Sequence, residues 1–169
     1  MLHTRLLVQS AAVLALAAYA PAIPAAAPAP TFDPATFFAG RTEGTATLKI
    51  IMRAARAVRV QGTGRVAPDG TLVLDQIVAQ EGQPVTKRQW RIRRTGPKTY
   101  AGTLSDAVGP IAGEVTGNRL HLSFRMKGGI ATEQRLTLGP DGRSATNILT
   151  ARKFGVTVAR LTETIRKLD

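Results

Sequence analysis

Hydrophobic and polar residues alternate strictly in several short segments of the chain, most clearly over residues 119–127. Leu120, Leu122, Phe124 and Met126 take one set of alternate positions, while arginine, histidine, serine and lysine take the other. A period of two is typical of a β-strand with one buried and one solvated face, because successive side chains point to opposite sides. Residues 119–127 are therefore predicted to form a half-buried strand.

Turn-forming residues separate such segments about every 8–14 residues, a spacing typical of all-β domains and not of βαβ units. Pro68-Asp69-Gly70 and Pro140-Asp141-Gly142 are the clearest hairpin signals, since glycine adopts a positive φ without steric cost. The predicted strands cover residues 44–53, 56–66, 71–80, 85–94, 98–104, 110–116, 119–127, 130–138, 144–152 and 155–166. Consecutive short strands form an antiparallel up-and-down meander, which removes its exposed edges by closing into a barrel of about 8–10 strands.

Two segments leave alternatives open. Val158, Leu161, Ile165 and Leu168 have helical spacing, but the segment is rich in β-branched residues, so we predict a strand with a short C-terminal helix as the alternative. Gly62-Thr63-Gly64 lies within a predicted strand and lacks the third glycine of a dinucleotide fingerprint. It is interpreted as a bulge or a barrel kink and not as a phosphate loop.

The N-terminal residues have the pattern of a secretory signal peptide. Arg5 supplies the positive start, residues 6–20 are uncharged and mostly apolar, and a Pro/Ala stretch follows. We predict a leader over residues 1–27 with cleavage between Ala25 and Ala29, and hence a periplasmic or secreted protein with no membrane span in the mature chain. The alternative is a buried helix or a membrane anchor. The chain contains no cysteine, which excludes disulfides, thiolate nucleophiles and lipid attachment to an N-terminal cysteine.

Residues 28–43 are predicted to form a separate N-terminal segment ahead of a barrel domain over residues 44–169. Asp33 followed by Pro34 has the pattern of a helix start, so a short helical turn is expected there. Phe37 and Phe38 follow directly and are expected to plug an apolar space.

The charge balance is strongly basic. The chain has a net charge of +12, and Arg5 is the only charged residue of the leader, which leaves +11 on the mature protein. Such an excess attracts anionic lipid, polysaccharide or nucleic acid. The alternative is that these residues are the solvated outer faces of strands, because they are spread along the chain without a block.

Catalytic and metal-binding patterns are weak. His121 is the only histidine after the leader, so neither a transition-metal site nor a Ser-His-Asp triad is predicted. Asp106 lies between two predicted strands, where it either caps a turn or faces the barrel mouth as a ligand contact or general base. Trp90 lies among arginines, as in a nucleic-acid platform, but it shares a face with Ile92 and is predicted to be a core residue.

Several landmarks occur in a recognisable order along the chain: Phe37-Phe38-x-Gly40, Arg88-x-Trp90, Tyr100-x-Gly102 with Asp106, Gly117-Asn118-x-Leu120 and Lys153-Phe154-Gly155. In this the sequence resembles an uncharacterised bacterial family of small exported proteins, often lipoproteins, known only as a domain of unknown function. The resemblance implies a lipocalin-like barrel. The chain departs from the family pattern in lacking a lipid-attachment cysteine and an Asp-Trp pair near residues 132–135. It also has Gln76 and Glu81 where Glu and Asp are expected.

The leading hypothesis is an exported lipocalin-like protein that binds a small apolar or amphipathic, fatty-acid-like ligand. The candidate ligand-binding residues are Arg88, Trp90, Tyr100, Asp106 and Arg125, and no cofactor is expected. One alternative is a basic protein that binds anionic lipid or polysaccharide of the cell envelope. Another is an enzyme of unrecognised type, with Asp106 as its base.

Overall fold

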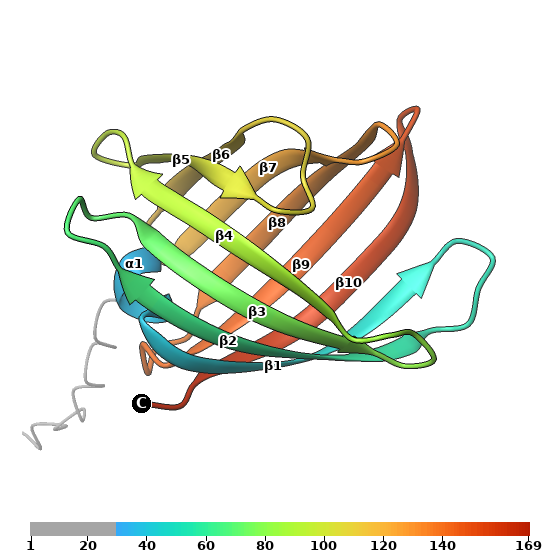
Figure 1. Ribbon diagram of the computed structural model, residues 1–169, viewed down its shortest axis with the longest axis horizontal. Helices are drawn as coiled ribbons and strands as arrows, with labels where there is room; N and C mark the ends of the chain where they lie inside the picture. The colour runs from blue at the N-terminus through green and yellow to red at the C-terminus, as the bar shows by residue number, and fades with distance from the viewer. Residues whose placement is uncertain (1–29) are drawn as a thin grey trace, which may run out of the picture.

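The structure, a computed structural model, describes residues 30–169, and the predicted leader lies outside them. One short helix, α1 (Pro34–Phe38), precedes ten antiparallel strands (Figure 1). The strands are β1 (Gly40–Ile50), β2 (Arg56–Val66), β3 (Leu72–Gln80), β4 (Thr86–Arg94), β5 (Thr99–Leu104), β6 (Ile111–Thr116), β7 (Arg119–Met126), β8 (Ile130–Leu138), β9 (Ser144–Lys153) and β10 (Val156–Lys167). No helix within the described residues has the length and apolar character needed to cross a membrane.

Every strand pairs with its neighbours in sequence, and the first strand also pairs with the last. β1 and β10 run antiparallel from the pair Thr42 and Lys167 to the pair Ile50 and Ala159, which closes the sheet into a barrel. Closure gives each of the ten strands a neighbour on both sides, although β4 pairs with β5 only over Trp90–Arg94. The predicted all-β, lipocalin-like barrel is therefore confirmed, with ten strands.

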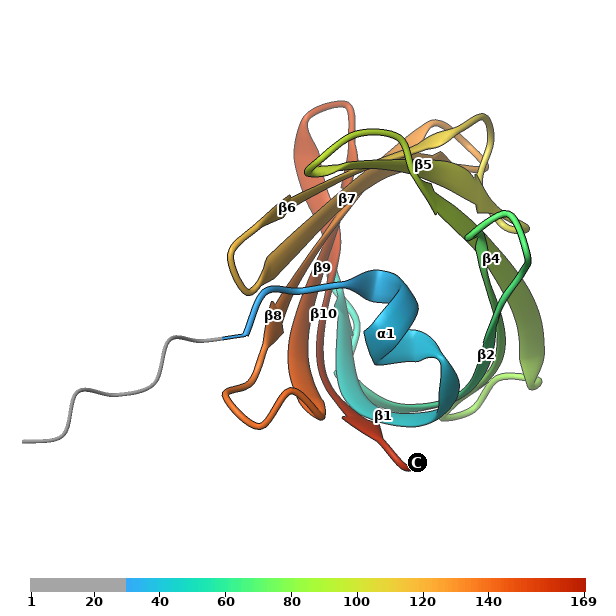
Figure 2. The ribbon, with the colours of Figure 1, turned by 90° about the vertical axis from the view of Figure 1, so that its left-hand side faces the viewer.

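The helix α1 lies in one end of the barrel, which we call the closed end (Figure 2). Phe32, Phe37 and Phe38 are buried there, with ring centroids 4.9–6.5 Å apart. The Phe32 amide donates a hydrogen bond to the Gly117 carbonyl at 2.9 Å. Lys167 of β10 donates from Nζ to the carbonyls of Thr36, Phe37 and Ala39, the last one at very short range. These contacts fix the aromatic plug to the β6–β7 turn and to β10.

Gly62 and Gly64 do not form a bulge, so of the two predicted alternatives, a bulge or a barrel kink, the bulge was wrong. Both glycines pair in continuous register with β1 and β3. A Cβ atom added at Gly64 would overlap the carbonyl oxygen of Phe38, so the strand needs glycine where the plug passes over it. The only register shift recorded among the described strand pairs lies between Thr157 and Ala159, where β10 pairs with β9.

The first strand begins earlier than the sequence predicted, whereas the last strand agrees with its prediction. The first strand begins at Gly40, four residues before the predicted start, because Thr42 points inward and pairs with Lys167. The C-terminal segment is strand β10, as predicted, and the helical alternative was wrong. Its β-branched residues pair along both β1 and β9, and this pairing outweighs the helical spacing of its leucines.

An apolar core fills the barrel from the closed end toward its middle. Alternate residues point inward, and at this end nearly all of them are large and apolar. The core includes Leu72, Leu74, Trp90, Ile92, Leu104, Ile111, Leu120, Leu122, Phe124, Leu136, Leu138 and Ile165. Trp90 is thus a core residue, as predicted, with its ring edge-on to Phe124 at 5.5 Å.

Candidate functional site in the barrel interior

A layer of polar side chains crosses the barrel interior above the apolar core. On β3 and β4, Gln76 pairs with Arg88, two residues beyond the inward pair Leu74 and Trp90. Across the barrel, Asn147 of β9 pairs with Glu163 of β10. Since inward positions recur every second residue, all four side chains occupy the inward register. Gln134 of β8 is buried beside them, so five strands contribute to this polar layer.

Gln76 is the centre of the hydrogen bonds on one side of the layer. Its Oε1 atom accepts from Arg88 Nε at 2.8 Å and from Trp90 Nε1 at 2.9 Å. The Arg88 guanidinium also lies 5.9 Å from the centre of the Trp90 ring. Two separate contacts therefore hold the guanidinium in one orientation within the interior.

The terminal nitrogens of Arg88 remain available. Within residues 30–169, Arg88 forms no salt bridge, and its hydrogen bond to Gln76 uses Nε alone. Neither terminal NH₂ group is among the fully enclosed polar atoms that lack a partner in this part of the chain, so both touch open space. A guanidinium presents two parallel N–H donors that match a carboxylate or a phosphate.

Glu163 is the acidic member of the layer. Its Oε2 atom accepts a hydrogen bond from Asn147 Nδ2 at 2.9 Å, and the residue is 7% exposed. Burial raises the pKa of the Glu163 carboxyl, while the Asn147 hydrogen bond and the positive charge of Arg88 act in the opposite direction. Burial also lowers the pKa of the Arg88 guanidinium, partly offset by Glu163 and Asp106. Both charges thus lack full solvation inside the barrel.

The cavity between the polar layer and the apolar core, on the side of the closed end, is small. The cavity between Arg88, Glu163 and the apolar residues beneath them has a volume of about 30 Å³, which is comparable to the share of one water molecule in the liquid. A larger ligand therefore has no room toward the closed end.

The interior is accessible from the other end, which we call the open end. Leu48, Val78, Leu149 and Leu161 occupy inward positions of β1, β3, β9 and β10 on the far side of the polar layer. All four are partly exposed, whereas inward residues of the core are buried. Solvent therefore reaches the apolar wall above Arg88 from the open end, and the barrel is not completely filled by side chains.

Comparison with known proteins gives a family for this chain. The family model described as "Protein of unknown function (DUF3833)" matches residues 13–167. The chain belongs to the DUF3833 family. No curated protein sequence matches this DUF3833 member.

A solved structure shares the fold. The S-type phycobiliprotein lyase CPES from Guillardia theta superposes with a TM-score of 0.59 and 8% sequence identity. The match covers 78% of the DUF3833 chain and 88% of the lyase chain. At this identity the likeness shows the lipocalin-like barrel alone.

The five residues predicted as ligand contacts do not all meet in this DUF3833 barrel. Arg88 and Trp90 lie together in the polar layer. Asp106 follows β5 at the open end, accepts a hydrogen bond from Ser105 Oγ at 2.9 Å and contributes its charge to Arg88. Tyr100 lies instead at the closed end, under the Arg94 guanidinium at 5.0 Å, and its pKa is raised by burial.

Arg125 lies on the outer face of the barrel, as its alternation with the inward Phe124 requires. It is exposed beside Ser123 and Glu133 and does not reach the interior. His121 is also on the outer face, with Nε2 3.9 Å from a Glu133 oxygen. Both residues are thus remote from the polar layer of the DUF3833 interior.

Sequence analysis did not find the partners Gln76, Gln134, Asn147 and Glu163. A signal for them was present, because each occupies an inward position in a strand whose other inward residues are mostly apolar. In β3, for example, Leu72 and Leu74 are followed two residues later by Gln76. Such an interruption of the apolar register marks a polar group inside a barrel.

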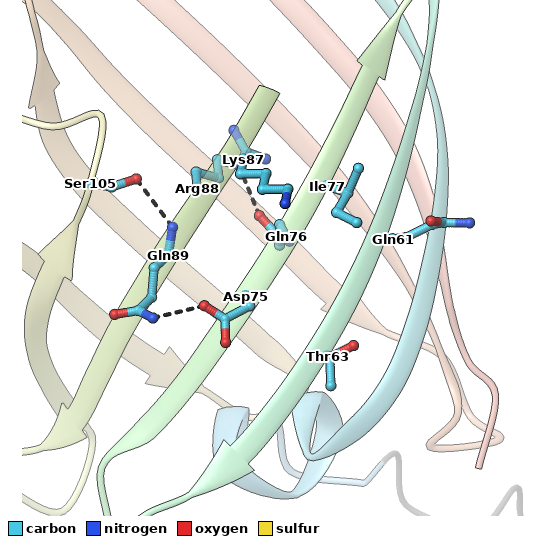
Figure 3. Close-up of a pocket in the computed structure, with 9 residues that line it drawn as sticks. All are labelled: Gln61, Thr63, Asp75, Gln76, Ile77, Lys87, Arg88, Gln89 and Ser105. Carbon is cyan, nitrogen blue, oxygen red and sulfur yellow. Dashed lines mark hydrogen bonds between the residues drawn. The ribbon is translucent and has the colours of Figure 1, made fainter. Parts of the chain in front are cut away.

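A second hollow lies outside the barrel, over β2, β3 and β4 (Figure 3). Gln89 lies across this hollow. Its side-chain Nε2 atom donates to Asp75 Oδ1 at 2.7 Å, and its backbone N–H group donates to Ser105 Oγ at 3.1 Å. Its volume is about 540 Å³, but its exposed side chains, such as Gln61 and Ile77, belong to the outer face of the sheet. Gln76 and Arg88 also line this hollow, and their side chains bond to each other.

Proposed function

We propose that this DUF3833 protein binds a small amphipathic molecule with an acidic head group, such as a fatty acid, inside its barrel. The head group contacts Arg88, and the apolar portion extends toward the open end between Leu48, Val78, Leu149 and Leu161. The lipocalin-like fold supports this arrangement, because such pockets are mostly apolar with a few fixed polar groups. The leader pattern supports export of the protein before it meets its ligand.

The observation that carries the proposal is that the Arg88 guanidinium is held in place inside the barrel without an ion-pair partner among the described residues. A guanidinium inside a barrel is costly to desolvate, and here it is held in place by Gln76 and Trp90 with its terminal N–H groups pointing into open space. An incoming carboxylate supplies the missing counter-charge. The nearest internal acid, Glu163, does not do so, because within the described residues it forms no ion pair with Arg88 and its carboxyl accepts a hydrogen bond from Asn147 instead.

The test compares two ligands that differ only in their head group, decanoate and decanol. The chain has a single tryptophan, Trp90, and it lies beside Arg88, so its fluorescence reports occupancy of the interior directly. We expect decanoate to bind more tightly than decanol, and Arg88→Gln to weaken decanoate about tenfold or more while changing decanol little, as expected for a charged hydrogen bond.

Arg125→Gln is the matched control, because it removes an arginine from the outer face and leaves the interior unchanged. Equal affinity for the acid and the alcohol, or an equal loss in both arginine variants, would overturn the proposal. Native mass spectrometry of the protein purified from the cells that export it, followed by lipid extraction, identifies the natural ligand.

A further inference from the structure

Large apolar side chains are exposed on three loops at the open end. Met52 is 97% exposed and Phe154 95%, and Val85, Val156 and Ile51 are each more than half exposed. Met52 lies in the loop between β1 and β2, Val85 in the loop between β3 and β4, and Phe154 in the turn between β9 and β10. We call these five residues the apolar rim. All three loops lie at the end of the barrel opposite α1 (Figure 1).

Two parts of the apolar rim follow neighbouring strands. β1 and β10 are paired, and the Ile51 amide extends the pairing with a hydrogen bond to the Val158 carbonyl at 2.9 Å. The loop that carries Met52 and the turn that carries Phe154 therefore leave the barrel side by side.

The backbone at the two most exposed tips is unfavourable for the residues it carries. Met52 has a φ of 59° and Phe154 a φ of 51°, in the left-handed region that bulky side chains rarely adopt. The turn Phe154-Gly155 joins two strands with two residues, a place where Asn-Gly is strongly preferred. Stability alone would favour asparagine at both tips. The sequence instead places a large apolar group there, in water and on a strained backbone.

Positive charge surrounds the apolar rim. Lys49, Arg53, Arg56, Lys87 and Lys153 lie in or beside the three loops, and Glu81 is the single carboxylate in the same segments. The Lys153 ammonium lies 5.7 Å from the Phe154 ring centre, next to the tip itself. Apolar tips flanked by cations are the chemistry that fits the boundary of an anionic lipid bilayer, where the apolar groups enter the acyl region and the cations meet the head groups.

We propose that the apolar rim docks the protein onto an anionic lipid bilayer with the open end of the barrel facing the membrane. Docking itself needs no particular ligand in the interior. If the proposed function is also correct, the docked orientation allows an amphipathic ligand to pass between the bilayer and Arg88 without crossing bulk water.

The experiment measures co-sedimentation of the chain from residue 28 onward, which contains α1 and all ten strands, with lipid vesicles. Vesicles of phosphatidylglycerol and phosphatidylcholine in equal parts are compared with vesicles of phosphatidylcholine alone. We expect binding to the anionic vesicles that weakens as salt is added.

Met52→Asn together with Phe154→Asn removes the apolar tips while favouring the left-handed backbone, so this variant retains its fold. It should bind the anionic vesicles about tenfold more weakly, since two apolar groups no longer enter the lipid. Ile148→Thr, which changes an exposed apolar residue on the outer face of β9, should bind as the unmodified chain does.

Lys87→Gln and Lys153→Gln should each weaken binding about fivefold. Arg119→Gln and Arg166→Gln, which remove exposed charges near the closed end, should have little effect. An equal loss of vesicle binding in the open-end and closed-end variants would show that overall charge, and not the apolar rim, drives association. That result would overturn the proposal. So would sedimentation velocity showing a dimer that the double asparagine variant abolishes, with no binding to vesicles.

Discussion

The side-chain amide of Asn147 donates a hydrogen bond to the Glu163 carboxyl at 2.9 Å, across two neighbouring strands and inside the barrel. This bond gives the buried Glu163 carboxyl one hydrogen-bond partner at a position that is poorly solvated. Burial is the largest influence on the Glu163 pKa and raises it. The polar layer is therefore a source of pH dependence as well as a candidate binding site.

The stability of the protein should fall as pH rises above the ordinary range of a glutamate. A raised folded pKa means that the folded state holds a proton that the unfolded chain releases. The stabilisation is thus fully present below the unfolded pKa and is lost as pH rises through the folded pKa. The loss amounts to about 1.4 kcal/mol for each unit by which the pKa is raised.

Glu163→Gln should remove this slope, because the amide cannot ionise. Urea denaturation of both proteins at several pH values between 4 and 8 measures the difference. Parallel stability curves would contradict the assignment of the slope to Glu163.

Replacement of Gln76 by an acid should close the proposed ligand site. The Gln76 Oε1 atom lies 2.8 Å from Arg88 Nε, so Gln76→Glu puts a permanent counter-charge beside the guanidinium. We expect decanoate to bind at least about tenfold more weakly, because it competes with an internal carboxylate. Trp90 fluorescence measures the affinity, and Gln61→Glu on the outer face is the control. Unchanged affinity in Gln76→Glu would mean that the acid head group does not contact Arg88.

The aromatic plug should depend on Lys167. This residue donates to three carbonyls at the end of α1, and Lys167→Met removes all three bonds. Loss of hydrogen bonds to a charged group should cost about 1.5–3 kcal/mol of unfolding free energy. Chemical denaturation measures the change, with Lys98→Met, an exposed residue of the β4–β5 loop, as the control. Equal effects in the two variants would count against the plug contact.

Gly64, which lies beneath the aromatic plug, should also be necessary for the stability of the barrel. A methyl group at Gly64 would overlap the Phe38 carbonyl, which is backbone and cannot rotate away. Gly64→Ala should therefore destabilise the barrel by about 2–3 kcal/mol or displace α1. At Gly96, by contrast, the added methyl group meets only the hydroxyl of the flexible Thr99 side chain. Thermal denaturation of the two alanine variants compares the sites, and similar losses would contradict the steric explanation.

The fold could be predicted from the sequence because strand alternation and turn residues act locally. The alternation of Leu120, Leu122 and Phe124 fixes which face of β7 is buried, whatever the rest of the chain does. The start of β1 could not be predicted in this way, because residues 40–43 are strand through their pairing with residues 61–64 of β2, and Thr42 and Glu43 also pair with β10, more than a hundred residues away.

The candidate site was only partly predictable for the same reason. Arg88 and Trp90 were found from local landmarks, but the β3–β4 pair Gln76 and Arg88 and the β9–β10 pair Asn147 and Glu163 face one another only because the barrel closes. Arg125 was named as a candidate ligand contact, although its alternation with Phe124 already assigns it to the outer face. The direction of a side chain in a strand thus carries more information about a barrel interior than the residue type alone.

The pairing of β1 with β10 also brings the start of the barrel sheet close to the last residues of the chain. Gly40 and Asp169 meet at the plugged end, where Arg41 bonds to the Asp169 carboxylate through its amide at 2.7 Å. A tether attached at residue 30 or after Asp169, whether a fused domain or an affinity tag on a solid support, therefore holds the molecule by its base and presents the opposite opening outward. Immobilisation at either point is a ready means of displaying that opening, in one orientation, to lipids or candidate ligands in solution.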